Sequence, residues 1–183
     1  MQRSIILAIG TGLLALAIHL GATQYLALSI TELTDRADVV LQGKVAAKTC
    51  LRDETGRIYT RVEIEVTEVW KGSLSSNRFI IALASGILGD QGVAVSGEAT
   101  YDVGEEVVAF LVLNHRGEGV TLGLIQGKFD VTVEPATGTK LARNMFHGAH
   151  AGFEAQRQIQ AGLAPMRLTV TDLKTQVSGK ATK

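Results

Sequence analysis

The chain has 183 residues, which is enough for one domain with a sizeable core and too few for two full-sized domains beside an export segment. Its 18 basic and 18 acidic residues cancel, so no excess positive field exists to hold a polyanion, and nucleic-acid binding is disfavoured. The 20 glycines, 2 prolines and 46% apolar residues are typical of a globular protein with many tight turns and not of a disordered one.

The N-terminus has the order of a secretory signal peptide. Arg3 precedes an apolar stretch from Ile5 to Leu20, and Gly21-Ala22 supplies small residues for cleavage. The stretch is slightly shorter than the roughly 20 residues that a spanning helix needs, so we expect cleavage and a secreted or periplasmic protein. The alternative is a retained membrane anchor, the only membrane contact that the sequence predicts.

A short helix and a bent strand are expected next. Ser29-Ile30-Thr31-Glu32 matches the S-x-x-E capping box, in which the serine oxygen and the glutamate carboxylate satisfy free backbone N–H groups, and predicts a helix to about Arg36. The β-branched run that begins after Asp38 predicts a strand to about Cys50. Gly43 inside this run indicates a bulge or a sharp bend.

The stretch "RIYTRVEIEVTEVWKG" predicts the return strand of a long hairpin, after the polar turn "LRDETGR". Val62 and Ile64 alternate with charged residues and are expected to face the core. The adjacent Val69 and Trp70 break this alternation, which predicts a bulge that turns Trp70 inward.

Cys50 is the only cysteine, so it cannot form an internal disulfide in the oxidising compartment that export predicts. Its functional interpretations are a reactive thiol or an intermolecular bridge. We favour a small residue near a strand end, because no basic or His-rich sequence context marks the thiol as activated.

The rest of the chain predicts further strands and then helices. Strands are expected in "RFIIALA", "VVAFLVLN", "VTLGLIQ" and "GKFDVTVE", with a long, irregular connection from Ser85 to Gly97. Helices are expected from about His150 to Ala161 and in "TVTDLKTQVSGK", the latter capped by Thr169 or Thr171.

These elements predict a mainly β fold, a small antiparallel OB-like barrel with peripheral helices near the N- and C-termini. Links of hairpin length without interleaved helices argue against βαβ units. The expected divisions are a signal peptide over 1–22, a β-barrel domain over 23–145 and a C-terminal helical extension over 146–183, packed on the barrel.

The motifs "ADVV" and "VEIEVTEVWKG", followed by "VGEEVVAFLVLNHRGEGVTLGLIQGKFDV", resemble the netrin-like module of tissue inhibitors of metalloproteinases. They are equally similar to a group of secreted bacterial proteins of unassigned function. The resemblance spans roughly Ala37 to Val133 and implies a five-stranded Greek-key barrel of OB type. The inhibitors act through a disulfide-bonded N-terminal cysteine that chelates zinc. Here the expected N-terminus is Thr23 and the family's cysteines are absent, so no inhibitory residue carries over.

Four residues are candidates for ligand binding: Trp70, Lys71, Gly89 and Asp90. Trp70, at a strand end beside Lys71, is either an exposed recognition anchor or part of the core, and we favour the core. Gly89 and Asp90 lie in the long connection, which is either a flexible crossover or a rim over the barrel mouth. Asp90 follows no alternating acidic pattern, so a turn-forming role is favoured over calcium binding.

His147, His150 and Glu154 form the sharpest metal hypothesis. The H-x-x-H spacing can place two imidazoles on one helical face, and Glu154 adds a carboxylate four residues later. Gly148 separates the two histidines and no HExxH pattern is present, so surface or capping histidines are favoured.

The sequence therefore predicts an exported, non-enzymatic module that needs no cofactor and binds a protein or another extracytoplasmic ligand. A barrel end or the long loop from Ser85 to Gly97 is expected to present the contact surface. The resemblance implies a protease-inhibitor-like domain, with a secreted metalloprotease as its partner. Two alternatives remain: a metal-binding protein or enzyme centred on the two histidines and Glu154, and a structural component of the cell envelope.

Overall fold

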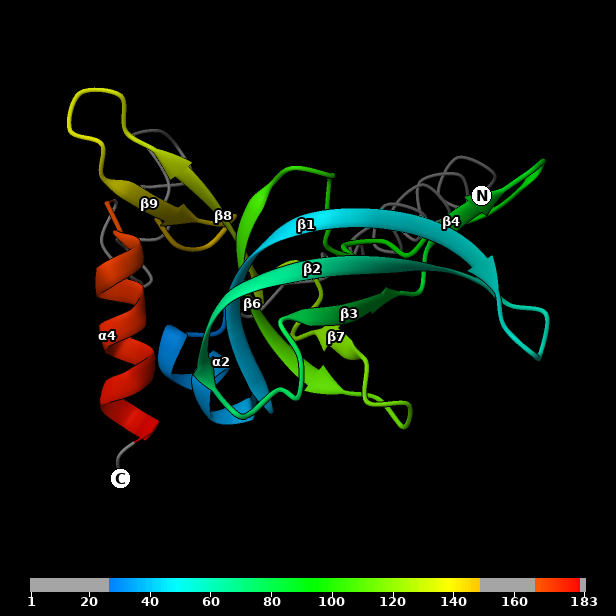
Figure 1. Ribbon diagram of the computed structural model, residues 1–183, viewed down its shortest axis with the longest axis horizontal. Coiled ribbons are helices and arrows are strands. Elements are labelled where there is room, and N and C mark those ends of the chain that lie inside the picture. Colours follow the sequence, from blue (N-terminus) through cyan, green and yellow to red (C-terminus); the bar gives the residue numbers. More distant parts are fainter. Residues whose placement is uncertain (1–26, 149–166, 182–183) are drawn as a thin grey trace, which may run out of the picture.

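The computed structural model describes residues 27–148 and 167–181, and five of its strands close into a barrel (Figure 1). The barrel strands are β1 (Val39–Arg52), β2 (Ile58–Lys71), β3 (Arg78–Leu83), β6 (Glu106–Leu113) and β7 (Gly119–Thr121). Their order is β1-β2-β3-β7-β6, and pairing of β6 with β1 closes the circle. Every neighbouring pair is antiparallel except β3 and β7. The prediction of a mainly β, OB-like small barrel is confirmed.

The β1–β2 hairpin bends at the places where the sequence predicted irregularity. Leu41 pairs with Val69 and Val40 pairs with Lys71, so Trp70 is the extra residue of a bulge. The register shifts again beside Gly43. A Cβ atom on Gly43 would lie 2.6 Å from the Glu65 carbonyl oxygen, so the bend requires a glycine there.

Two apolar cores share the strands β1 and β6. Val39 and Leu41 of β1 face the barrel interior, whereas Val40 between them packs outside the barrel. On β6, Val107, Ala109 and Leu111 likewise point inward, with Val108 and Phe110 outside. Burial on both faces explains the unbroken apolar runs of these strands.

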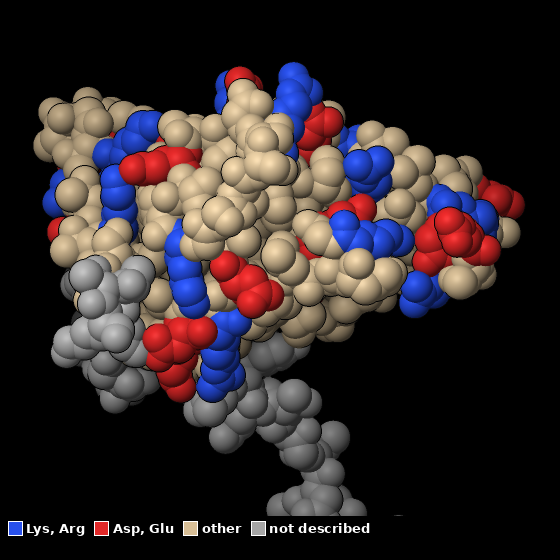
Figure 2. All heavy atoms as spheres, turned by 60° about the horizontal axis from the view of Figure 1, so that its bottom comes forward, with Lys and Arg blue, Asp and Glu red and all other residues tan. Residues whose placement is uncertain are grey.

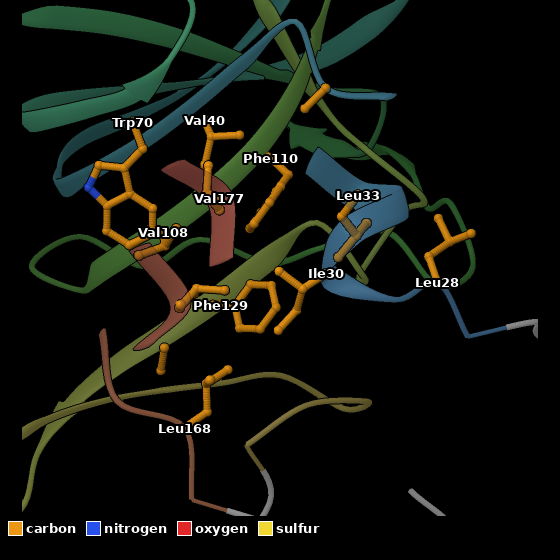
Figure 3. Packing of buried hydrophobic residues seen from close by; sticks show 13 residues of the cluster. Leu28, Ile30, Leu33, Val40, Trp70, Val108, Phe110, Phe129, Leu168 and Val177 are labelled. Carbon is orange, nitrogen blue, oxygen red and sulfur yellow. The ribbon is translucent and has the colours of Figure 1, made fainter. Parts of the chain in front are cut away.

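The outer core lies beneath two helices and a strand pair (Figures 1 and 3). The elements are α2 (Ile30–Arg36), α4 (Val170–Ala181), β8 (Lys128–Val133) and β9 (Lys140–Arg143). β8 continues from the barrel by pairing with β6, and β9 pairs with β8. The Ser29–Glu32 capping box of α2 is present as predicted. Thr169 is the predicted residue that caps α4, since its hydroxyl accepts a hydrogen bond from the Asp172 backbone N–H at 3.0 Å.

The structure differs from the sequence-based expectation in three places. The connection from Ser85 to Gly97, expected to be irregular, contains the hairpin β4 (Gly86–Leu88) and β5 (Gln91–Val93). β9 was not expected. The strand expected in "VTLGLIQ" ends at Thr121, because residues 122–127 form a loop closed by a Gly127 N–H to Leu122 carbonyl bond of 2.8 Å. The helix expected from His150 to Ala161 lies outside the described residues.

Within residues 27–148 and 167–181, neither helix is long and apolar enough to cross a membrane.

Candidate functional site

A groove with a volume of about 670 Å³ lies where the β4–β5 hairpin crosses the β1–β2 end of the barrel. Its walls come from four separate parts of the chain. Lys48 and Cys50 are contributed by β1, Thr60 by β2, and Leu83 by the end of β3. The hairpin and residues 92–100 complete the lining, so folding alone brings this surface together.

Glu98 fixes the start of the hairpin against the barrel. Its carboxylate accepts hydrogen bonds from the Ala84 N–H at 2.6 Å, the Ser85 N–H at 3.0 Å and the Ser85 hydroxyl. The Thr60 hydroxyl donates to the Ser85 carbonyl oxygen at 2.7 Å. The Glu98 bonds hold the two ends of the connection together, and the Thr60 bond ties its start to β2.

Gly86 is where the hairpin comes closest to the barrel. A Cβ atom at this position would lie 2.6 Å from the Cys50 sulfur and 2.8 Å from the Thr60 hydroxyl oxygen. Only glycine therefore fits between the hairpin and the two strands. The half-buried Cys50 thiol lies under this contact, near the end of its strand as the sequence predicted.

The hairpin presents apolar side chains to solvent beside the groove. Ile87 is 76% exposed, and Val93 and Val95 are 43% and 37% exposed. All three also line the groove. Apolar side chains gathered at an exposed hollow are typical of a contact surface, whereas single exposed apolar residues are common on any protein.

Trp70 and Lys71, two of the ligand-binding candidates, make contacts within the protein itself. Trp70 is 7% exposed, and Figure 3 shows its ring within the outer core beside Val108. Its indole N–H donates to the Glu68 carboxylate at 3.1 Å. The Lys71 amine donates to the carbonyl oxygens of Thr34 at 2.7 Å and Ala37 at 2.6 Å, at the C-terminal end of α2.

Gly89 and Asp90, the other two ligand-binding candidates, form the tip of the β4–β5 hairpin. Both are exposed, and Gly89 has a φ of 65°, as a tight turn requires. Thr60, beside the hairpin, and Trp70 are ten positions apart along β2, which corresponds to roughly 30 Å of strand. The structure therefore does not bring the four candidates into one site.

His147 is buried beneath the loop that follows β9. It is 1% exposed, stacks on Phe129 with 5.8 Å between ring centroids, and bonds through Nε2 to the Leu28 carbonyl oxygen at 2.8 Å. Because that carbonyl can only accept, Nε2 carries the proton, and Nδ1 has no hydrogen-bond partner in the described part of the chain. Burial lowers the pKa of His147, although the Leu28 carbonyl opposes this shift.

The metal hypothesis falls partly outside the described residues, because His150 and Glu154 both lie there. Within residues 27–148 and 167–181, no group of three or more His, Cys, Asp or Glu side chains is placed to hold a metal ion.

An ionic cluster around the buried Lys128 lies at one side of the barrel and was not predicted from the sequence. The Lys128 amine is 2.9 Å from the Glu105 carboxylate and 2.8 Å from that of Asp130, and it lies 5.1 Å from the centre of the Tyr101 ring. Tyr101 is fully buried, shares a 2.8 Å hydrogen bond with the Thr121 hydroxyl, and has a pKa raised by burial. A buried phenol that stays protonated has a structural role here.

No protein-family model matches the chain, and no curated protein is significantly similar to it.

Proposed function

We propose that this chain is an exported binding module that holds an apolar segment of an extracytoplasmic protein in the groove beneath the β4–β5 hairpin. The observation that carries the proposal is the exposure of Ile87 and Val93 on the hairpin, and of Val95 just after it, in the lining of a groove of about 670 Å³. Loops held by a rigid scaffold commonly carry recognition.

The hydrogen bonds of Glu98 and Thr60 support a preformed site. They anchor the hairpin on both the barrel and the connection, so little backbone ordering is needed when a partner binds. The apolar side chains then supply the area that a partner covers. Burial of each large apolar side chain contributes on the order of 1.5–3 kcal/mol before the entropy of association is subtracted.

Site-specific photo-crosslinking tests the proposal. A photoreactive amino acid at Ile87 or Val93 of the exported protein, irradiated in the producing cells, is expected to trap one and the same partner protein. Val133, which is 56% exposed on β8, is the matched control position and should trap none. Equal labelling at Val133, or no adduct at either hairpin position, would contradict the proposal.

On the basis of the netrin-like resemblance, we propose a secreted metalloprotease as the partner. The mature protein, incubated with a panel of secreted metalloproteases, is then expected to inhibit at least one of them at micromolar concentration. Ile87→Glu should abolish that inhibition if the groove is the contact surface. The absence of inhibition across the panel would remove the protease as partner while leaving the crosslinking result to decide on the groove.

A further inference from the structure

A second cleft, with a volume of about 640 Å³, lies between the β1–β2 turn and the β6–β7 turn. Arg57, just before β2, and Tyr59 and Arg61 within it stand at every second position and line the same cleft. Arg116, in the opposite turn, places its guanidinium 5.1 Å from the centre of the Tyr59 ring. Thr60, between Tyr59 and Arg61, lines the apolar groove, so the two hollows occupy opposite faces of the hairpin.

Two carboxylates of the cleft already accept hydrogen bonds from residues of their own turns. Asp53 accepts bonds from the Thr55 hydroxyl at 2.7 Å, the Thr55 and Arg57 backbone N–H groups at 2.9 Å, and the Arg57 Nε at 3.0 Å. Its pKa is lowered, chiefly by the Thr55 hydroxyl. Glu118 accepts from Asn114 at 3.0 Å and from the Arg116 Nε at 2.8 Å. Burial opposes ionisation of Glu118, but these bonds lower its pKa.

Two of the four guanidinium groups, those of Arg57 and Arg61, have N–H donors that meet no acceptor among the described residues. Arg57 donates to Asp53 through Nε, and its two Nη groups have no hydrogen-bond partner among the described residues. The Nε of Arg61 is 3.9 Å from Glu118, which is beyond hydrogen-bond length. Glu54 is an exposed carboxylate in the turn itself. The exposed donors of Arg57 and Arg61 are therefore available to bond an incoming acceptor in place of water.

We propose that this cleft binds the carboxylate groups of an acidic peptide segment. A guanidinium matches a planar carboxylate with two parallel hydrogen bonds. Arginine and tyrosine are also the residues that dominate binding energy at protein interfaces. The cleft lining holds four arginines and three carboxylates, and two of these carboxylates are already bonded within their own turns. Figure 2 shows both signs of charge gathered at the right-hand end, where the β1–β2 turn lies.

Titration of the full chain with a capped hexaglutamate peptide tests this site, with capped hexaglutamine as the matched peptide. The arginine Nε–H signals of Arg57 and Arg61 are followed by NMR. We expect both signals to shift with hexaglutamate alone, and added salt to reverse the shift. The double variant Arg57→Gln, Arg61→Gln is expected to weaken binding about five- to tenfold, as two exposed ion pairs are lost.

Arg167→Gln is the control variant, because Arg167 is an exposed arginine paired with Glu134 of the β8–β9 region, and it should bind hexaglutamate as the parent chain does. Glu54→Gln should bind hexaglutamate more tightly. The proposal is overturned if neither arginine signal shifts, if hexaglutamine shifts them equally, or if the double variant binds unchanged. It is also overturned if an oligogalacturonate shifts these signals and hexaglutamate does not, since the cleft then serves acidic glycans.

Discussion

Among single residues, Lys71 makes a dense set of contacts with the end of α2. Its amine lies 2.7 Å from the Thr34 carbonyl oxygen, 2.6 Å from that of Ala37 and 3.4 Å from that of Asp35. Charge-assisted bonds to the last carbonyls of a helix are stabilising, and Gly72 beside it packs against the Asp38 carbonyl with a φ of 82°. The "WKG" motif thus has a structural explanation.

We expect Lys71→Met to lower the free energy of unfolding by about 1–3 kcal/mol, because several helix-end carbonyls lose a charged donor. Urea denaturation of the purified protein measures this change. Lys140→Met is the control, since Lys140 forms an exposed ion pair with Glu106 and should change stability by less than about 1 kcal/mol. Equal effects of the two variants would show that the Lys71 bonds stabilise the protein no more than an exposed ion pair does.

His147 makes stability depend on pH. Burial lowers its pKa below the ordinary value of 6.5, so the unfolded chain binds the proton more readily than the folded one. Stability is therefore complete above about pH 6.5 and falls as the pH drops from there toward the folded pKa. One such group contributes a slope of up to about 1.4 kcal/mol per pH unit.

The expected result is a shallower fall in unfolding free energy between pH 6.5 and 5 for His147→Phe than for the parent chain. Phenylalanine keeps the contact with Phe129 and removes the titrating ring. Urea midpoints at a series of pH values measure the slope. The exposed His115, changed to Gln, is the control and should leave the slope as it is. A His147→Phe slope equal to that of the parent chain would show that another group titrates.

At the scale of elements, the bend in the β1–β2 hairpin depends on Gly43. Gly43→Ala should lower the unfolding free energy by about 1–3 kcal/mol, because the new methyl group would meet the Glu65 carbonyl and the Ile64 side chain, each at 2.6 Å. Gly92→Ala, in β5, is the matched control, since its methyl group would meet no atom closer than 3.6 Å. Thermal unfolding of both variants compares them, and indistinguishable melting temperatures would contradict this account of the bend.

An element can be predicted from the sequence when the residues that determine it lie close together in the chain. The helix α2 follows from Ser29 and Glu32, three residues apart, and the bulge at Trp70 follows from a break in alternation. β9, with the sequence "KLAR", has neither β-branched residues nor alternation, and it becomes a strand because β8 offers a partner. The β4–β5 hairpin is anchored by Glu98, eight residues beyond Asp90 at its tip, so its glycine content alone wrongly predicted an irregular connection.

The candidate site was predictable only in part for the same reason. The sequence predicts a contact surface at a barrel end or on the connection after β3, from the length of that connection and its position as a loop. The groove itself needs Cys50, Thr60 and Leu83 from three different strands, and only the folded barrel brings them together. The position of Trp70 has a local cause, because whether its ring is exposed or buried depends on the direction in which the bulge turns it.

For the whole molecule, the two cores share β1 and β6, so loss of either core removes support from the other. Alternate residues of these strands belong to the barrel interior and to the outer core. Unfolding of the outer core would leave Val40 and Phe110 exposed on strands that still have to pair. We therefore expect one cooperative unfolding transition for the barrel and the helical layer.

Trp70 provides a test of this coupling, because it is the only tryptophan and lies in the outer core, whereas far-ultraviolet circular dichroism reports on the strands and helices of both layers together. Urea transitions followed by both signals should coincide. Leu173→Ala, which removes a fully buried side chain of α4, should shift both midpoints together and lower stability by about 2–5 kcal/mol. If the fluorescence transition of this variant moved to lower urea while the dichroism transition stayed in place, α4 would be a separately unfolding layer and the shared strands would not couple the cores.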